Sequence, residues 1–167
     1  MTTASAKSAW KHWIQAGIII LVLTLLDQVS KHLVLTYLKG ENDISLISGV
    51  LQLRYIENRG MAFGLFEGKI PVFVILCLLF FCLFVYVYAR IPRTRYYLPL
   101  AVTSVIMVSG ALGNFIDRVF RGYVVDFIYF SLIDFPVFNM ADIYVVCSGI
   151  LLVLLVCFKY RNDEDYD

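Results

Sequence analysis

Residues 17–37 read GIIILVLTLLDQVSKHLVLTY, an apolar run long enough to cross about 30 Å of hydrocarbon as a helix of roughly 20 residues. Runs of similar length follow at residues 70–89, 97–116 and 140–158. The chain of 167 residues is 60% hydrophobic and has a mean hydropathy of +0.79, well above the range of soluble domains. The sequence therefore predicts an all-α membrane protein, a single integral domain over residues 1–167 with four transmembrane helices.

The first run shares one feature with a cleavable signal peptide, because Lys7 and Lys11 precede it. It continues, however, through Asp27 and Lys31 to Tyr37, and no small-x-small cleavage site follows it. We therefore expect this segment to be retained as the first transmembrane helix.

The distribution of positive charge predicts the orientation of the chain. An even number of spans places both termini on one side of the membrane. The short segments on that side carry Lys7, Lys11, Arg90, Arg93, Arg95, Lys159 and Arg161. By the positive-inside rule, both termini are expected in the cytoplasm. The net charge of +1 gives no indication of a nucleic-acid partner, and since the chain has no basic block, none is expected.

The first outer loop, about residues 44–68, carries the strand signal of the chain. Apolar and polar side chains alternate around Val50, Gln52 and Arg54, and Asn58-Arg59-Gly60 has the composition of a turn. We expect a small antiparallel β-sheet here, lying as a cradle on the outer membrane surface.

The second outer loop, about residues 117–139, ends at a recognisable helix start. Pro136 is excluded from a helix interior, so the last helix should begin after it. Asn139 is a favourable N-cap, and Asp142 then occupies the third helical position. An acid at this position is stabilised by free N–H groups and by the helix dipole, so capping alone would explain Asp142.

Asp126 lies in an apolar segment, where an unpaired carboxylate is costly. It would be satisfied by a salt bridge to Arg118 or Arg121, or by a second carboxylate that shares its proton. The second arrangement requires the chain between Asp126 and Asp142 to fold back as a hairpin, and Asp134-Phe135-Pro136 is suitable turn material. Two such aspartates would activate water and protonate a leaving group, as in aspartic peptidases.

Other polar residues occur within or beside the spans. Asp27 and Lys31 are one helical turn apart, and we favour a mutually neutralising pair facing the bundle over direct catalysis. Asn114 and Arg118 share a helix face in the same way. They would either bind a substrate or lipid headgroup, or bond a neighbouring helix and reach the membrane interface. Asp117 and Asp134 are alternative acids for the pair.

Five short strings occur in one order: LDQVSK at 26–31, ENRGMAF at 57–63, GNFIDR at 113–118, VVDF at 124–127 and FNMAD at 138–142. Together with four spans, they resemble the lipoprotein signal peptidase, or signal peptidase II, family over most of the chain. The resemblance implies a bacterial inner-membrane aspartic endopeptidase that removes signal peptides from prolipoproteins. Cleavage would fall just before a cysteine that carries a diacylglyceryl group.

The resemblance also implies roles for individual residues. Asp126 and Asp142 match the catalytic pair. Positions that bind substrate or shape the pocket are assigned to Asp27, Lys31, Asn58, Gly60, Asn114, Asp117, Arg118, Asn139 and Ala141. No cofactor or metal is expected. The partners would be lipid-modified prolipoproteins and membrane lipids, the protein a monomer, and the active site near the periplasmic face.

Two features depart from the family pattern. The interval between Asp126 and Asp142 is short, and Met61 stands where a small residue is expected. Two other functions are compatible with the polar residues: an ion-coupled transport subunit with a carboxylate relay, and a non-catalytic assembly factor. A presenilin-type protease is disfavoured because the chain contains no GxGD string.

Overall fold

The computed structural model describes residues 3–60 and 70–161. The predicted fold class is confirmed: a mostly helical chain with a small antiparallel sheet. The helices are α1 (Thr3–Tyr37), α2 (Ile70–Arg90), α3 (Leu98–Phe120) and α4 (Met140–Leu154), the last continued by a π-helical turn at Leu155–Lys159. The strands are β1 (Ile44–Ile47), β2 (Leu51–Asn58) and β3 (Val124–Phe130).

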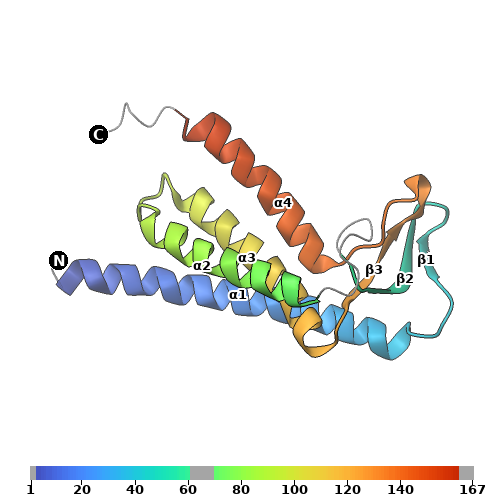
Figure 1. Ribbon diagram of the computed structural model, residues 1–167. Helices are drawn as coiled ribbons and strands as arrows, with labels where there is room; N and C mark the ends of the chain where they lie inside the picture. Colours follow the sequence, from blue (N-terminus) through green and yellow to red (C-terminus); the bar gives the residue numbers. More distant parts are fainter. Residues whose placement is uncertain (1–2, 61–69, 162–167) are drawn as a thin grey trace.

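Helix α3 is the centre of the bundle and packs against α1, α2 and α4 (Figure 1). The sheet lies at one end, and the start of α1 and the end of α4 lie at the other (Figure 1). Within the described residues, four helices are long and apolar enough to cross a membrane, over Trp10–Tyr37, Pro71–Arg90, Leu98–Phe120 and Met140–Lys159.

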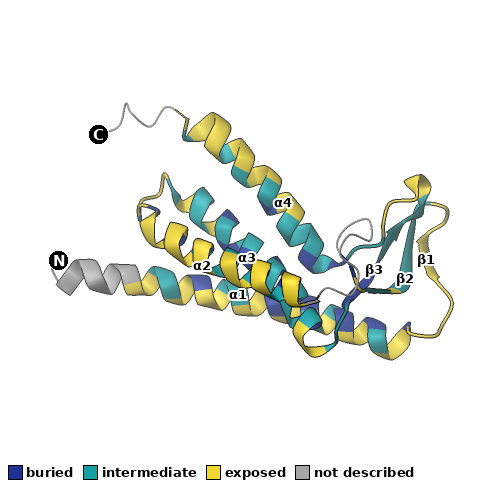
Figure 2. Ribbon diagram, viewed as in Figure 1, coloured by how far each residue is buried: buried dark blue, intermediate teal, exposed yellow. Residues whose placement is uncertain are grey.

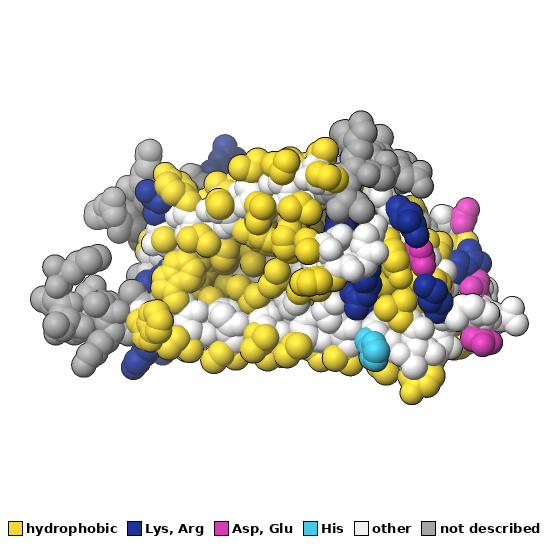
Figure 3. All heavy atoms as spheres, turned by 60° about the horizontal axis from the view of Figure 1, so that its bottom comes forward, with side chains coloured by type: hydrophobic (Ala, Val, Ile, Leu, Met, Phe, Trp, Pro, Cys, Tyr) yellow, Lys and Arg dark blue, Asp and Glu magenta, His cyan; other side chains and the backbone are white. Residues whose placement is uncertain are grey.

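The outer faces of these helices are apolar and exposed. Figure 2 shows exposed residues along the outside of α1, α2 and α4, with buried ones where helices meet. Figure 3 shows a belt of hydrophobic side chains between two ends that carry the charged ones. Exposed apolar surface of this extent is stabilised by lipid, so the protein spans a membrane.

Two helices extend beyond their expected bounds. α1 begins well before residue 17, because nothing in the preceding segment breaks a helix. α3 continues past residue 116 to Phe120, so Asp117 and Arg118, expected in the outer loop, are helical. The ion pair between Asp117 and Arg121, one turn apart, holds this added turn.

The sheet has the order β1-β2-β3, with antiparallel neighbours. β1 and β2 form the predicted cradle hairpin, whose turn includes Gly49 at φ 69°, a backbone conformation that favours glycine. The third strand comes from the second outer loop, outside the predicted range 44–68. Met61 and the remainder of that range beyond residue 60 lie outside the described residues.

Strand β3 carries one face of the functional site. Val125 and Phe127 are buried against Val34 and Leu38 near the end of α1. Because side chains alternate along a strand, Asp126 points to the opposite face. Packing of the apolar face onto α1 thus fixes the direction of the carboxylate.

Candidate active site

The predicted foldback between the two aspartates is confirmed. β3 ends in one 3-10 turn at Ser131–Ile133, followed by Asp134 at a left-handed φ of 51°. The chain then returns antiparallel, with Phe138 N–H donating to Ile128 O at 3.0 Å and Ile128 N–H donating to Phe138 O at 2.8 Å. This pairing brings Asn139 beside Asp126.

The start of α4 has the predicted cap. Asn139 Oδ1 accepts from Asp142 N–H at 3.0 Å, and Asp142 Oδ2 accepts from Asn139 N–H at 3.1 Å, forming a capping box. Ala141 N–H donates to Asp27 Oδ1 on α1 at 3.0 Å. The free N–H groups of this helix end therefore receive carboxylates from two elements.

Three asparagine amides surround the two candidate carboxylates. Asn139 Nδ2 donates to Asp126 Oδ1 at 2.6 Å, and Asn58 Nδ2 donates to Asp126 Oδ2 at 2.8 Å. Asn114 Nδ2 donates to Asp142 Oδ1 at 2.8 Å. Asn139 thus links the two aspartates, since its side chain contacts Asp126 and caps Asp142.

Asp126 is almost entirely buried, with 2% of its surface exposed. Burial and then the charge of Asp142 raise the pKa of Asp126 from 3.8 to about 6, while the Asn58 and Asn139 hydrogen bonds oppose the rise. This carboxyl can therefore exchange a proton near neutral pH, which is what a general acid or base requires.

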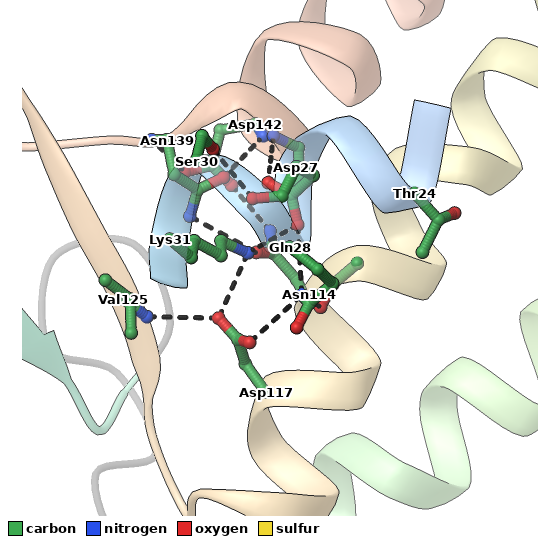
Figure 4. A network of polar contacts seen from close by, with 12 residues as sticks. Thr24, Asp27, Gln28, Ser30, Lys31, Asn114, Asp117, Val125, Asn139 and Asp142 are labelled. Atoms are coloured by element: carbon green, nitrogen blue, oxygen red, sulfur yellow. Dashed lines mark hydrogen bonds and ion pairs between the residues drawn. The ribbon is translucent and has the colours of Figure 1, made fainter. Parts of the chain in front are cut away.

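A buried ion cluster lies beside Asn114 and Asp142 (Figure 4). Lys31 Nζ contacts Asp27 Oδ2 at 2.9 Å, Asp117 Oδ2 at 3.0 Å and Asn114 Oδ1 at 2.9 Å. Lys31, Asp27 and Asp117 are each fully buried. The expected Asp27–Lys31 pair is present, and Asp117 also joins it, on the far side of Asn114 from Asp142.

The arginines expected as salt-bridge partners of Asp126 have other contacts. Arg121 pairs with Asp117 and donates to Gln28 Oε1 at 3.0 Å. Arg118 donates to Asn114 O at 3.2 Å and to Gly60 O at 3.3 Å. Arg118 therefore ties α3 to the end of β2, and the carboxylate of Asp126 is held by amides.

One large cavity, of about 940 Å³, opens between β2, β3, the returning loop, α3 and α4. Both Asp126 and Asp142 line it. Its apolar wall includes Val124, Phe135, Phe138, Ile143 and Val146. Among the described residues, no group of three or more His, Cys, Asp or Glu side chains is placed to hold a metal ion.

The predicted supporting residues fall into two groups. Those that line the cavity are Asn58, Gly60, Asn114 and Arg118. Those that lie behind it, fully buried in the network, are Asp27, Lys31, Asp117, Asn139 and Ala141. The alternative acid Asp134 accepts from Tyr129 Oη at 2.6 Å and is exposed.

Sequence reasoning missed Gln28 and two glycines of α3. Gln28 Nε2 donates to Asp117 Oδ1 and to Gly113 O, both at 3.1 Å. A Cβ on Gly113 would overlap the Asp27 carboxylate, and one on Gly110 would overlap the Ala141 carbonyl oxygen. The small residues Ser109, Gly110 and Gly113 within one span were the available signal for this close approach.

Comparison with known proteins extends over most of the chain. A family model described as signal peptidase (SPase) II matches residues 19–158. A lipoprotein signal peptidase of Syntrophomonas wolfei is 43% identical over 145 residues, covering 86% of this chain and 93% of the relative. One from Clostridioides difficile is 40% identical over 141 residues, covering 84% and 93%.

Two solved bacterial membrane enzymes, both determined by the in meso method, have a similar fold. The one at 2.3 Å resolution has a TM-score of 0.80 and 30% identity, covering 92% of this chain and 93% of that chain. The one at 1.9 Å resolution has a TM-score of 0.76 and 32% identity, covering 87% and 93%.

Proposed function

The chain belongs to the signal peptidase II family of peptidases, and on that premise we propose that it removes signal peptides from diacylglyceryl-modified prolipoproteins. Cleavage falls just before the lipidated cysteine, and Asp126 and Asp142 are the catalytic pair. The observation that carries this proposal is the convergence of the two carboxylates, from β3 and α4, on one cavity with an apolar wall.

The chemistry follows from a pair that holds one proton. Water attacks the scissile carbonyl carbon while the ionised carboxylate takes its proton and the protonated carboxyl gives a proton to the carbonyl oxygen. In the resulting diol, the carboxyl that gave its proton to the carbonyl oxygen is now ionised, and it removes one hydroxyl proton. The other carboxyl, which took its proton from water, protonates the amine nitrogen as the carbon–nitrogen bond breaks, and the pair again holds one proton.

The position of the site suits a membrane-bound substrate. The cavity lies where α4 begins and the sheet covers the bundle, at the boundary between the apolar belt and the charged end (Figures 1 and 3). A lipidated signal peptide reaches it laterally from the membrane, with its acyl chains remaining in lipid. The scissile bond then meets water at this boundary.

The protein lies in the bacterial inner membrane, with cytoplasmic termini and the site near the periplasmic face. Support comes from the positive-inside pattern and from the start of α1 and the end of α4, which lie at the end opposite the sheet (Figure 1). The lipid-modified substrate would be made and processed in this same membrane.

The test is cleavage of a lipid-modified prolipoprotein by purified protein in detergent. Asp126→Asn and Asp142→Asn should each lose about 100-fold or more of the rate, as expected for a general acid or base. Glu41→Gln is the control, since Glu41 is an exposed acid of the first outer loop that does not line the cavity. Normal cleavage by either site variant, with normal folding, would refute the pair.

A second assay addresses recognition of the lipid. The same prolipoprotein without its diacylglyceryl group should be cleaved much more slowly, because it lacks the acyl chains that hold its cysteine at this membrane boundary. Equal rates for the two substrates would contradict lipid recognition and leave the carboxylate pair in place.

A further inference from the structure

The three asparagine amides at the site are each oriented by a neighbouring group that can donate a hydrogen bond but cannot accept one. Gly60 N–H donates to Asn58 Oδ1 at 3.1 Å, and Asp142 N–H donates to Asn139 Oδ1 at 3.0 Å. The oxygen end of each amide must face its backbone donor, so the Nδ2 end faces Asp126. Neither amide can reverse without losing both contacts.

Asn114 is oriented by a charge instead. Its Oδ1 accepts from Lys31 Nζ at 2.9 Å and from Asn139 Nδ2 at 3.2 Å, and its Nδ2 donates to Asp142 Oδ1 at 2.8 Å. An ammonium group has no acceptor, so Lys31 excludes the reversed amide. Its charge also polarises the amide and strengthens the hydrogen bond that Asn114 gives to Asp142.

The two aspartates therefore sit in unequal surroundings. Asp142 lies at a helix N-terminus, accepts from Asn139 N–H at 3.1 Å and receives the amide that Lys31 polarises. Asp126 lies in a strand among buried apolar neighbours such as Val124 and Val125. These surroundings favour negative charge on Asp142 and the proton on Asp126.

We propose that Lys31 is a positioning residue of the peptidase reaction: through Asn114 it holds the negative charge of the singly protonated pair on Asp142. This inference rests on the proposed function and assigns the roles within it. Asp142 takes the proton from water, and Asp126 gives its proton to the carbonyl oxygen. Lys31 itself touches no substrate, because it is fully buried behind Asn114.

The charges facing the pair determine how this is tested. From α1 these are Asp27 and Lys31, and from α3 they are Asp117 and Arg118, with Arg121 at the end of that helix. The charged residues from β2 and the loops that line the same cavity are Arg54, Glu57, Arg59 and Asp134. Within the buried cluster, Asp27 and Asp117 balance Lys31 and Arg121. Removing Lys31 alone leaves an uncompensated buried acid, which unfolds many proteins.

The double variant Asp27→Asn/Lys31→Met removes one charge of each sign and keeps this balance. It should cleave the lipid-modified prolipoprotein with a kcat reduced about tenfold or more, the factor expected for weakening a hydrogen bond to a charged group. Its KM should stay within about threefold, and the acidic limb of its pH–rate profile should move to higher pH.

Two single variants separate this role from a structural one. Asp27→Asn alone leaves an extra positive charge, so its acidic limb should move to lower pH, opposite to the double variant. Thr24→Val removes a buried hydrogen bond from Thr24 Oγ1 to Ser109 O, on the same helix but away from Asn114. It should lower thermal stability and leave the pH profile unchanged.

A readout independent of cleavage is the carboxyl-carbon NMR signal in protein labelled with ¹³Cγ-aspartate, assigned with Asp126→Asn and Asp142→Asn. Between about pH 5 and about pH 8, the native Asp142 signal should stay at the ionised position while that of Asp126 changes. In the Asp27→Asn/Lys31→Met variant, the Asp142 signal should change as well.

The proposal is overturned if the Asp142 signal is the same in the native protein and the double variant, or if Asp126 is the ionised member. It is also overturned if the acidic limb does not move. Failure of the native protein to cleave prolipoprotein would instead refute the proposed function, and the NMR signals would still show where the charge lies.

Discussion

Replacing Gly113 by alanine should destabilise the bundle, because three helices meet at this glycine. A Cβ there would overlap the carboxylate of Asp27 and lie 3.4 Å from Cβ of Ala141. Asp27 has little freedom to move, since its Oδ2 is 2.9 Å from Lys31 Nζ and its Oδ1 accepts from Ala141 N–H at 3.0 Å. The added methyl group must displace either the ion pair or the start of α4.

The magnitude follows from the contacts that are lost. Overpacking a tight site costs about 1–3 kcal/mol. Losing the hydrogen bond between the charged Asp27 and Ala141 N–H costs about 1.5–3 kcal/mol, and the higher helix propensity of alanine returns about 1 kcal/mol. Gly113→Ala should therefore reduce the free energy of unfolding by about 1.5–5 kcal/mol.

The assay is thermal unfolding in detergent, with Gly149→Ala as the matched control. A Cβ on Gly149 would lie 3.4 Å from Met107 Cε, an ordinary contact, so this variant should be unchanged or slightly more stable. For a chain of this size, the melting temperature of Gly113→Ala should fall by about 3–20 °C. A melting temperature equal to that of Gly149→Ala would refute the close approach of Asp27 to α3.

The remaining predictions concern the surroundings of the carboxylates. Because burial and the Asp142 charge raise the pKa of Asp126 to about 6, the folded state holds more protons than the unfolded state between about pH 4 and this value. Stability should therefore fall as pH rises across that window, by about 3 kcal/mol, and Asp126→Asn should remove this slope in thermal unfolding. Asn58→Leu removes a hydrogen bond that lowers the pKa of Asp126, so the alkaline limb of cleavage, where the general acid Asp126 loses its proton, should move to higher pH; an unmoved alkaline limb would contradict this. Asn139→Ser keeps a capping oxygen and lacks the amide that reaches Asp126, so cleavage should fall about tenfold or more while the melting temperature changes little. Normal cleavage by Asn139→Ser would assign Asn139 to capping alone.

The spans and the α4 cap were predictable because their signals are local. A run of apolar residues and the Asn139 to Asp142 capping box are each read within one segment. Strand β3 was missed because its sequence VVDFIYF becomes a strand only by pairing with β2, far away in the chain. For example, Leu51 of β2 pairs with Phe130 of β3, and nothing in the sequence around either residue indicates the other.

The choice of partner for Asp126 was open for a related reason. The sequence offered Arg121 as a salt-bridge partner of Asp126, but in the fold Arg121 pairs with Asp117 and contacts Gln28 of α1. Gln28 is uncharged, so charge patterning did not identify it as a partner. Since Gly113 permits α1 and α3 to approach closely, the arginine is drawn away from Asp126. A single sequence contains no signal for such competition between partners.

The pair can hold a proton because, within the described residues, asparagine amides and no cations contact the two carboxylates. Lys31 contacts Asn114, one of these amides. A cation in contact with Asp126 would favour its ionised form and remove the general acid from the reaction. Asn58 and Asn139 orient this carboxyl while burial still raises its pKa. Lys31 contacts Asn114, which donates to Asp142, and the charge of Lys31 lowers the pKa of Asp126 less than the Asn58 and Asn139 hydrogen bonds do. A buried lysine so placed can make two chemically identical aspartates unequal, which a mechanism with one acid and one base requires.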